Sequence, residues 1–324
     1  MPLNKILVVY NTCGIKPNEN SESYINSLNS ILDQDTDKFD VVMSSCLNND
    51  YTRQEVKSFF GNRIKYNFIN EVHPVNVTFN HSVDTVVKYN DEYMGYMYVD
   101  SGSSFSPYKD AISSLREYLD TNKYGMITPQ PSNDTEYFAG LGFGKYEEDN
   151  DAAREEIFKD GDYLIPLGKG MGTHTNLVSN DIRKFYGRTY PDIFASHCTE
   201  STFSFINAAI GKQWILLKKF IFDHEVSMDG QSSGFDTFSW VATGRPTYDH
   251  PYKIPSIINR LCTDEATECG FGYEECRNIF MHDPNQFDDN YHCKNDILKD
   301  FIKDNLFLKK EELDYGSIRH EYYD

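Results

Sequence analysis

The chain has 324 residues with a formal net charge of -19, and 39% of its residues are hydrophobic and 15% aromatic. This composition excludes an intrinsically disordered chain, and the negative charge argues against nucleic acids and anionic lipid surfaces as partners. No segment reaches the ~20 apolar residues of a transmembrane helix, and residues 1–10 lack the features of a secretory leader. The seven cysteines form no regular framework, which suits a reducing compartment. We therefore expect a cytoplasmic protein without a transmembrane segment.

The first part of the chain alternates between patterns typical of strands and of helices. Buried strands are expected at residues 5–10, 39–43, 66–69, 94–99 and 124–128. Helices are expected over 24–32, after a capping box at 52–55, over 79–87, and over 107–119 with Ser106 as the cap and Pro107 as the first residue. This alternation predicts an α/β fold with a mostly parallel sheet covered by helices on both faces.

The second part of the chain is less regular. Residues 129–180 are rich in Gly, Asp, Asn and Glu and are expected to form a long loop region. A helix over 201–210 ended by Gly211, a strand over 214–217 and a helix near 297–308 follow. We expect a catalytic domain over residues 1–235 and a partly helical C-terminal extension over 236–324 that packs on it.

Three residues at or after predicted strand ends are candidates for chemistry. Asp100 follows a buried strand and is suited to holding a divalent cation, although an Asp there is also a common turn former. Glu200 precedes a helix and is either a general base or a residue that stabilises the helix N-terminus. A single histidine is usually structural, but His224 lies among polar residues, which strengthens the case for a ligand role.

Other clusters give weaker signals. The glycine clusters at 140–144 and 168–172 lack the strand-to-helix context of a dinucleotide fingerprint and do not match a Walker motif, so we interpret them as loops. The spacings of Cys262, Cys269, Cys276 and Cys293, with His282 and His292, are too wide for a usual zinc ribbon.

The order of the main segments resembles that of glycosyltransferases of the A fold, most closely family 2, over about residues 4–235. The segments that carry the resemblance are VVYNTCG at 8–14, VTFNHSV at 77–83, Asp100-Ser101-Gly102, Thr199-Glu200-Ser201 and His224. In that family they correspond to a donor-binding turn, a Phe/Arg-Asn pattern on the diphosphate side, an Asp-x-Asp-type motif, an acidic catalytic motif and a further metal ligand.

The resemblance implies a role for each matching residue. Asp100 and His224 would hold a divalent metal, Mn²⁺ or Mg²⁺, and Glu200 would be the catalytic base. The donor-binding residues would be Tyr10, Asn11, Thr12, Ser44, Ser45, Asn80 and Asp100, with the two serines close to the base. The implied substrates are a nucleotide-diphosphate sugar and a glycan or other acceptor hydroxyl.

Three departures from the family pattern leave parts of this assignment open. Gly102 replaces the usual second acid, which leaves strict metal dependence open. Ser44-Ser45-Cys46 replaces the Asp that often reads the nucleobase, so the base is open. The acidic pair of the catalytic motif is reduced to Glu200.

The implied reaction is direct displacement at the anomeric carbon with inversion, and retention stays open. One alternative is a nucleotidyltransferase that makes nucleotide sugars, but that reaction needs a Gly-rich basic loop that residues 8–16 lack. A second alternative is a non-catalytic module that binds nucleotides or sugars and does not hydrolyse a nucleotide sugar.

Overall fold

A computed structural model describes most of the N-terminal two thirds of the chain and two C-terminal segments. The described residues are 3–13, 21–46, 50–69, 75–90, 92–131, 141, 150–171, 175–191, 202–224, 296–307 and 320–323. Within them, no helix is both long enough and apolar enough to span a bilayer.

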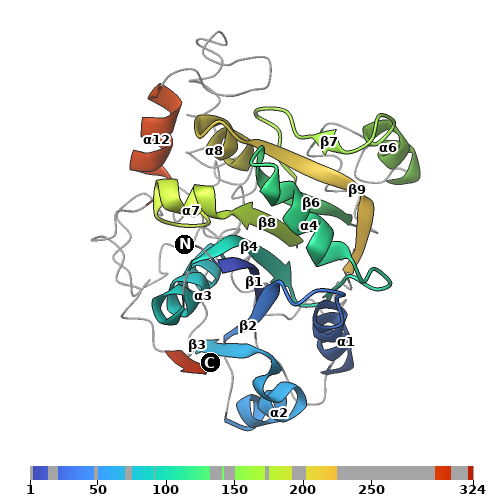
Figure 1. Ribbon diagram of the computed structural model, residues 1–324, viewed down its shortest axis with the longest axis vertical. Coiled ribbons are helices and arrows are strands. Elements are labelled where there is room, and N and C mark those ends of the chain that lie inside the picture. Colours follow the sequence, from blue (N-terminus) through green and yellow to red (C-terminus); the bar gives the residue numbers. More distant parts are fainter. Residues whose placement is uncertain are drawn as a thin grey trace, which may run out of the picture.

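One sheet of ten strands organises the described residues, in the order β10-β3-β2-β1-β4-β8-β6-β9-β5, with β7 paired to β9 (Figure 1). The strands are β1 Leu3–Cys13, β2 Phe39–Cys46, β3 Lys65–Ile69, β4 Tyr93–Asp100, β5 Ser103–Ser104, β6 Tyr124–Pro131, β7 Tyr163–Leu164, β8 Thr175–Ser179, β9 Gln213–His224 and β10 His320–Tyr323. β1 to β4 are mutually parallel, and β8 runs antiparallel to both β4 and β6. Since β9 is parallel to β6, six strands share one direction, which confirms the expected mostly parallel α/β sheet.

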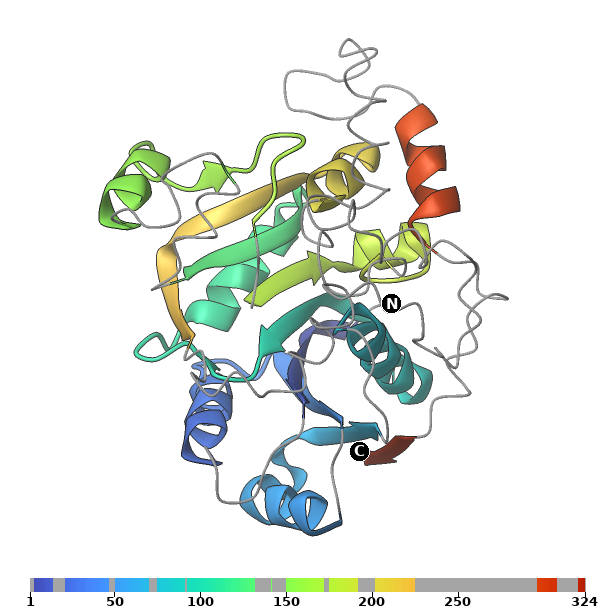
Figure 2. The same ribbon diagram turned by 180° about the vertical axis from the view of Figure 1, so that it is seen from behind.

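Helices cover both faces of this sheet. The helices are α1 Ser21–Leu32, α2 Asp50–Phe60, α3 Val75–Tyr89, α4 Ala111–Asp120, α6 Asn150–Ile157, α7 Asn180–Tyr186, α8 Phe203–Ala209 and α12 Ile297–Asn305. The apolar residues of α1, α2 and α4 share one core with one face of the sheet, and those of α3, α6, α7, α8 and α12 share the other. Figure 2 shows this arrangement from behind. We call these the α1 face and the α3 face.

Strand β1 shows why the sheet is buried on both sides. Ile6 and Val8 point into the core of the α1 face, while Leu7 and Val9 point into that of the α3 face. Because successive side chains of a strand alternate between faces, a continuous apolar run is what a central strand with two covered faces requires.

The structure differs from the sequence-based expectation at β8 and at the start of α4. β8 lies within the expected loop region, at the centre of the sheet between β4 and β6. The expected helix start at Ser106 and Pro107 is wrong, because α4 begins at Ala111 after Asp110. The expected helix end near Gly211 is confirmed, since α8 ends at Ala209 and Gly211 has a φ of +71°.

The two described C-terminal segments lie against the rest of the sheet and its helices. On α12, Leu298 and Ile302 are buried in the core of the α3 face, and the Phe307 ring stacks on Tyr186 with centroids 4.4 Å apart. β10 pairs antiparallel with β3, so the chain ends at that edge of the sheet (Figure 1). The domain boundary expected at residue 235 lies outside the described residues and stays a prediction.

Candidate functional site

Polar side chains come together at the carboxyl ends of the central parallel strands. In the ladder, Asn11 of β1 is opposite Ser44 of β2 and opposite Asp100 of β4. Residues opposite each other share a face, so these three side chains line up on the α3 face. Thr12 and Ser45 are opposite each other one position further on and point to the α1 face. Ligands of open α/β sheets bind at this edge.

The turn after β4 brings Asp100 close to the end of β9 in the fold. Residues 100–104, which we call the Asp100 turn, lead from β4 into β5. β5 pairs antiparallel with β9, and Ser103 is opposite His224. The backbone of His224 is therefore aligned with a residue three positions after Asp100. A metal contact of His224 stays a prediction.

Gly102 has a structural reason to replace the second acid. Its φ is +93°, a region that L side chains rarely adopt and glycine adopts readily. An Asp at this position would be strained in the observed turn. The backbone conformation of the turn from β4 into β5 therefore explains why glycine occupies position 102, where the family pattern has a second acid.

The Asp100 turn is supported by neighbouring elements. The Ser101 N–H donates to the Asn11 carbonyl at 2.9 Å, which extends the β1–β4 ladder by one bond. From the α1 face, the Gly102 N–H donates to the Tyr10 hydroxyl oxygen, and Ser27 of α1 donates its hydroxyl to the Ser103 carbonyl. These bonds fix the turn relative to β1 and α1.

Tyr10 is a buried core residue. Its hydroxyl donates to the Tyr24 carbonyl at 3.3 Å, and burial raises the pKa of Tyr10 well above its usual value. These contacts place Tyr10 beneath the Asp100 turn. The predicted contact of Tyr10 with the nucleoside stays a prediction.

The carboxylate of Asp100 is hydrogen-bonded within its own strand. The Tyr98 hydroxyl donates to Asp100 Oδ1 at 3.1 Å. The Tyr98 oxygen also accepts a bond from the Asn11 side chain, and Asn11 Oδ1 accepts from Thr78 of α3 at 3.2 Å. Burial first, and then the negative charge of Asp100, raise the pKa of Tyr98 well above its usual value, so Tyr98 is a protonated donor at neutral pH.

Ser44 and Ser45 have different surroundings although they are adjacent. On the α3 face, Ser44 Oγ accepts from Ser82 of α3 at 2.8 Å, and Ser82 Oγ accepts from Asn67 of β3 at 2.8 Å. The second N–H of the Asn67 amide donates to His81 Nδ1 at 3.1 Å. On the α1 face, Ser45 Oγ is buried without a hydrogen-bond partner in the described part of the chain.

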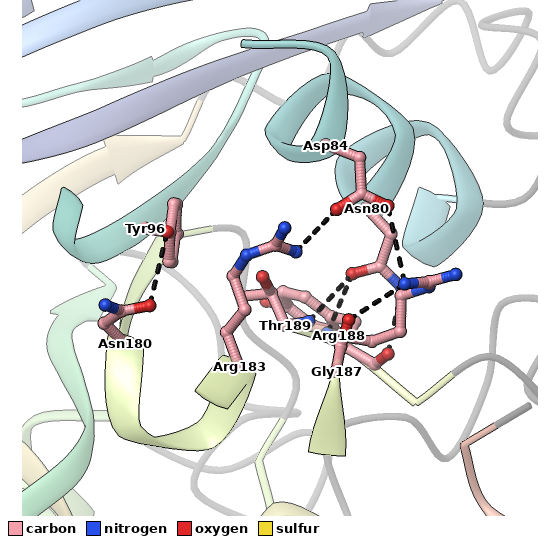
Figure 3. Close-up of polar contacts among 9 residues, drawn as sticks. Asn80, Asp84, Tyr96, Asn180, Arg183, Gly187, Arg188 and Thr189 are labelled. Carbon is pink, nitrogen blue, oxygen red and sulfur yellow. Dashed lines mark hydrogen bonds and ion pairs between the residues drawn. The ribbon is translucent and has the colours of Figure 1, made fainter. Parts of the chain in front are cut away.

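Asn80 contacts backbone rather than the Asp100 turn. Its Oδ1 accepts from the N–H groups of Thr189 and Tyr190 at 3.1 and 3.0 Å, and its Nδ2 donates to the Tyr190 carbonyl at 2.9 Å (Figure 3). Asn76 donates to the Pro191 carbonyl at 2.8 Å from the preceding turn of α3. These amides attach the segment after α7 to α3. Donor binding by Asn80 stays a prediction.

Two further buried hydroxyls lie at this edge and make no hydrogen bond within the described residues. They are Ser103 Oγ, in the Asp100 turn, and Thr175 Oγ1, on β8 opposite Val99. Buried polar atoms are nearly always paired, so each such group calls for an explanation, and an absent ligand or water is one. Together with Ser45, they are three buried hydroxyls on the α1 face of this edge without a hydrogen bond to the part of the chain that the structure describes.

The carboxylate of Asp100 at this edge is a type of ligand that divalent cations take. Mn²⁺ and Mg²⁺ take oxygen ligands and are often bound by one or two carboxylates together with substrate phosphates. Asp100 is partly exposed, and Tyr98 holds one of its oxygens. Among the described residues, no group of three His, Cys, Asp or Glu forms a metal site by itself. The protein side of the site would consist of Asp100 and His224.

Several predicted features cannot be placed on this site. Glu200, the cysteines from Cys262 to Cys293, His282 and His292 lie outside the described residues, as does all of the first glycine cluster except Leu141. In the second cluster, the Gly168 N–H donates to Ser204 Oγ of α8 at 3.1 Å. This contact makes Gly168 part of the packing of α8.

The sequence did not single out Tyr98 or Thr78 as parts of the site. Tyr98 had a detectable signal, because residues i and i+2 of a strand share a face and a Tyr two positions before Asp100 must lie beside it. Thr78 had none, since its contact with Asn11 spans 67 positions.

Comparisons with known proteins give distant matches in structure alone. No family model matches the chain, and no curated protein matches it in sequence. Among solved structures, it is similar to a mannosyltransferase from Pyrobaculum calidifontis in complex with GDP-Man and Mn²⁺, with 14% identity and a TM-score of 0.49 over 74% of this chain and 61% of that one. It is similar to S. aureus TarS 1-349, with 17% identity and a TM-score of 0.47 over 68% and 60% of the two chains.

A third similar structure is GalNAc-T7 with UDP, GalNAc and Mn²⁺, with 11% identity and a TM-score of 0.47 over 68% of this chain and 44% of that one. The match spans less than two thirds of the length of each of the three structures. Identities this low and TM-scores below 0.5 assign neither a donor nor an acceptor to this chain.

Proposed function

We propose that this protein is a metal-assisted glycosyltransferase that moves a sugar from a nucleotide-diphosphate sugar to an acceptor hydroxyl with inversion. The observation that carries the proposal is the Asp100 turn. An acidic residue ends a central parallel strand, in register with Asn11 and Ser44, and the turn that follows pairs with the end of β9 at His224. Such a constellation at the carboxyl edge of an α/β sheet suits an anionic ligand bound through a cation.

Asp100 and His224 would hold the metal, and the donor's diphosphate would complete its coordination. A divalent ion bound there supplies Lewis-acid stabilisation of the charge that develops on the leaving diphosphate. The protein carries a formal charge of -19, so an anionic donor needs such a local positive charge. Ser45, whose hydroxyl makes no hydrogen bond with the described residues, is the stronger of the two serines as a contact for the nucleoside.

Glu200 would accept the proton of the acceptor hydroxyl. As the acceptor oxygen bonds to the anomeric carbon, the bond from that carbon to the diphosphate oxygen breaks, and the diphosphate leaves with the electron pair. The proton ends on the Glu200 carboxylate. A single displacement of this kind inverts the anomeric configuration.

A screen of nucleotide sugars tests the proposal and separates its alternatives. UDP-, GDP- and dTDP-sugars are added to the protein with and without Mn²⁺, and the melting temperature and the release of nucleoside diphosphate are recorded. A bound ligand at about 100 times its Kd stabilises the native state by about 2.7 kcal/mol. We expect one nucleotide class to raise the melting temperature more with Mn²⁺ and to be slowly hydrolysed.

Two other outcomes would overturn the proposal. Stabilisation without hydrolysis or transfer, for every donor and acceptor tried, would indicate a non-catalytic binding module. Release of pyrophosphate from a nucleoside triphosphate and a sugar 1-phosphate would indicate a nucleotidyltransferase.

Glu200→Gln tests the base. The variant keeps the size of the side chain and removes its basicity, and positioned general bases contribute roughly 10²–10⁴-fold. We expect transfer to fall by that range while donor affinity stays within about twofold of wild type, measured on one sample by transfer rate and donor titration. If Glu200 stabilises the helix N-terminus instead, the variant loses about 1 kcal/mol or less of stability and keeps its turnover per folded molecule.

A further inference from the structure

A chain of hydrogen bonds runs from α3 to the predicted metal ligand and has one direction throughout. The Thr78 hydroxyl donates to Asn11 Oδ1, the Asn11 amide donates to the Tyr98 oxygen, and the Tyr98 hydroxyl donates to Asp100 Oδ1. An amide oxygen can only accept and its NH₂ can only donate, so the Asn11 side chain fixes the order of donors and acceptors. This series of hydrogen bonds ends at Asp100 Oδ1, a carboxylate oxygen that accepts the last of them.

Packing holds the Tyr98 ring in one orientation. Only 4% of the residue is exposed. Its ring meets Phe79 of α3 edge to face with centroids 5.6 Å apart, and Tyr190 likewise at 6.1 Å. Because the ring cannot reorient without displacing two other aromatic rings, its hydroxyl is a fixed point for the Asp100 carboxylate.

We propose that Tyr98 is a positioning residue for Asp100 as a metal ligand, and that Asn11 and Thr78 act through it. The inference rests on the proposed function, because it takes Asp100 as the residue that binds the cation. It gives Asn11 a different role from the nucleoside contact that the sequence implied. Both groups of the Asn11 amide are engaged by protein partners, and the residue is 6% exposed.

The expected consequence is a change in metal affinity. A carboxylate with one oxygen held by a donor loses less rotational freedom on binding a metal than an unrestrained one does. Removing a residue that orients a metal ligand typically costs 10–100-fold in metal affinity. Tyr98 contacts Asp100 through its hydroxyl, so removal of that one oxygen is the informative change.

Tyr98→Phe keeps the ring and removes the hydroxyl. The affinity for Mn²⁺, alone and with UDP or GDP, is measured by electron paramagnetic resonance of the unbound ion, which needs no turnover. We expect the affinity to fall about 10–100-fold in the variant. Thr78→Val removes the first donor of the chain and is expected to weaken binding in the same direction by a smaller factor.

Tyr96→Phe is the matched control. Tyr96 is buried two residues earlier on the same face of β4, and its hydroxyl contacts Asn180 Oδ1 at 3.3 Å instead of Asp100 (Figure 3). A general effect of losing a buried hydroxyl would appear equally in both variants. We expect Mn²⁺ affinity in Tyr96→Phe to stay within about twofold of wild type.

The outcomes separate this inference from the proposed function. If wild type binds Mn²⁺ and Tyr98→Phe binds it equally well, the positioning role is wrong and the metal site stands. If wild type does not bind Mn²⁺ even with UDP or GDP, the metal-assisted function and the inference are both wrong. If Tyr98→Phe does not fold, an unchanged Mn²⁺ affinity in Thr78→Val overturns the inference.

Discussion

Ser44 and Ser45 are adjacent in sequence and have opposite structural roles. Ser44 Oγ accepts from Ser82, within a buried network that continues through Asn67 to His81. Ser45 Oγ has no hydrogen-bond partner in the described part of the chain. Because burying a hydroxyl without a partner disfavours folding, a ligand that hydrogen-bonds to Ser45 at the carboxyl edge would offset that cost.

Alanine at each of these positions is expected to give opposite effects. Ser44→Ala leaves the Ser82 hydroxyl without its acceptor and should lower the free energy of unfolding by about 1–3 kcal/mol. Ser45→Ala removes a buried hydroxyl that makes no hydrogen bond with the described residues, so it should leave the free energy of unfolding unchanged or raise it. It should weaken binding of a nucleoside diphosphate by about 2- to 12-fold, the equivalent of one net hydrogen bond.

Urea unfolding and calorimetric titration of UDP or GDP measure both quantities for each variant. Each variant is the control for the other, because both changes remove one oxygen from neighbouring residues. Full nucleotide affinity in Ser45→Ala, with weakened affinity in a stable Ser44→Ala, would contradict the assignment.

At the residue scale, sequence reasoning could locate single acids but not the partners that define their roles. Asp100 was identified because it ends a buried strand. The role of Asn80 as a backbone anchor could not be inferred, because its partners, Thr189 and Tyr190, lie about 110 positions later in the chain. The sequence does not contain a local pattern for such a contact.

Elements with a strong periodic pattern were predictable, and those defined by pairing were not. The five residues of β8 are all buried, so they lack the alternation that marks a half-buried strand. The four residues of β10 are exposed or partly exposed and form a strand because β3 offers an edge. Both strands depend on neighbours that are distant in sequence.

A carboxylate of α3 forms ion pairs with the arginines of α7 and of the residues after it. Asp84 of α3 accepts from Arg183 of α7 at 2.5 Å and lies 3.6 Å from Arg188 (Figure 3). The side chains of the three residues are 24%, 14% and 10% exposed, so solvent screens these charges only partly. Asp84 thus contacts two guanidinium groups in the segment that Asn80 also anchors.

Asp84→Ala is expected to lower the free energy of unfolding by about 1.5–3 kcal/mol, the range for a hydrogen bond to a charged group. Asp120→Ala is the matched control, because Asp120 is 53% exposed and forms an (i, i+4) pair with Arg116 at 3.5 Å. Exposed pairs of this kind contribute about 0.3–0.5 kcal/mol. Equal losses in the two variants, measured by chemical denaturation, would show that the ion pairs of Asp84 are no stronger than a surface pair.

Across the whole molecule, the core is built with tyrosines, of which the chain has 23. Burial raises the pKa of Tyr24, Tyr66 and Tyr96 to about 12, and it raises the pKa values of Tyr10, Tyr93 and Tyr98 further. These rings lie in both cores, on the α1 face and on the α3 face. The buried tyrosines on both sides of the sheet are therefore expected to ionise at alkaline pH, well above the usual pKa of tyrosine.

Alkaline unfolding is the expected consequence. The pKa of an unfolded tyrosine is about 10, and these folded-state values are higher, so the native state holds protons that the unfolded state releases. Their contribution to stability is complete below about pH 10 and is lost as the pH rises toward the folded-state values near 12.

An absorbance titration of tyrosinate, followed in parallel by circular dichroism, checks this expectation. We expect the exposed tyrosines to ionise first and the buried ones only together with loss of the native dichroism signal. The same chain in concentrated denaturant is the control and should ionise in one step near pH 10. One step near pH 10 in the native protein, with its dichroism intact, would mean that these rings are accessible to solvent and that the two cores are less closely packed than described.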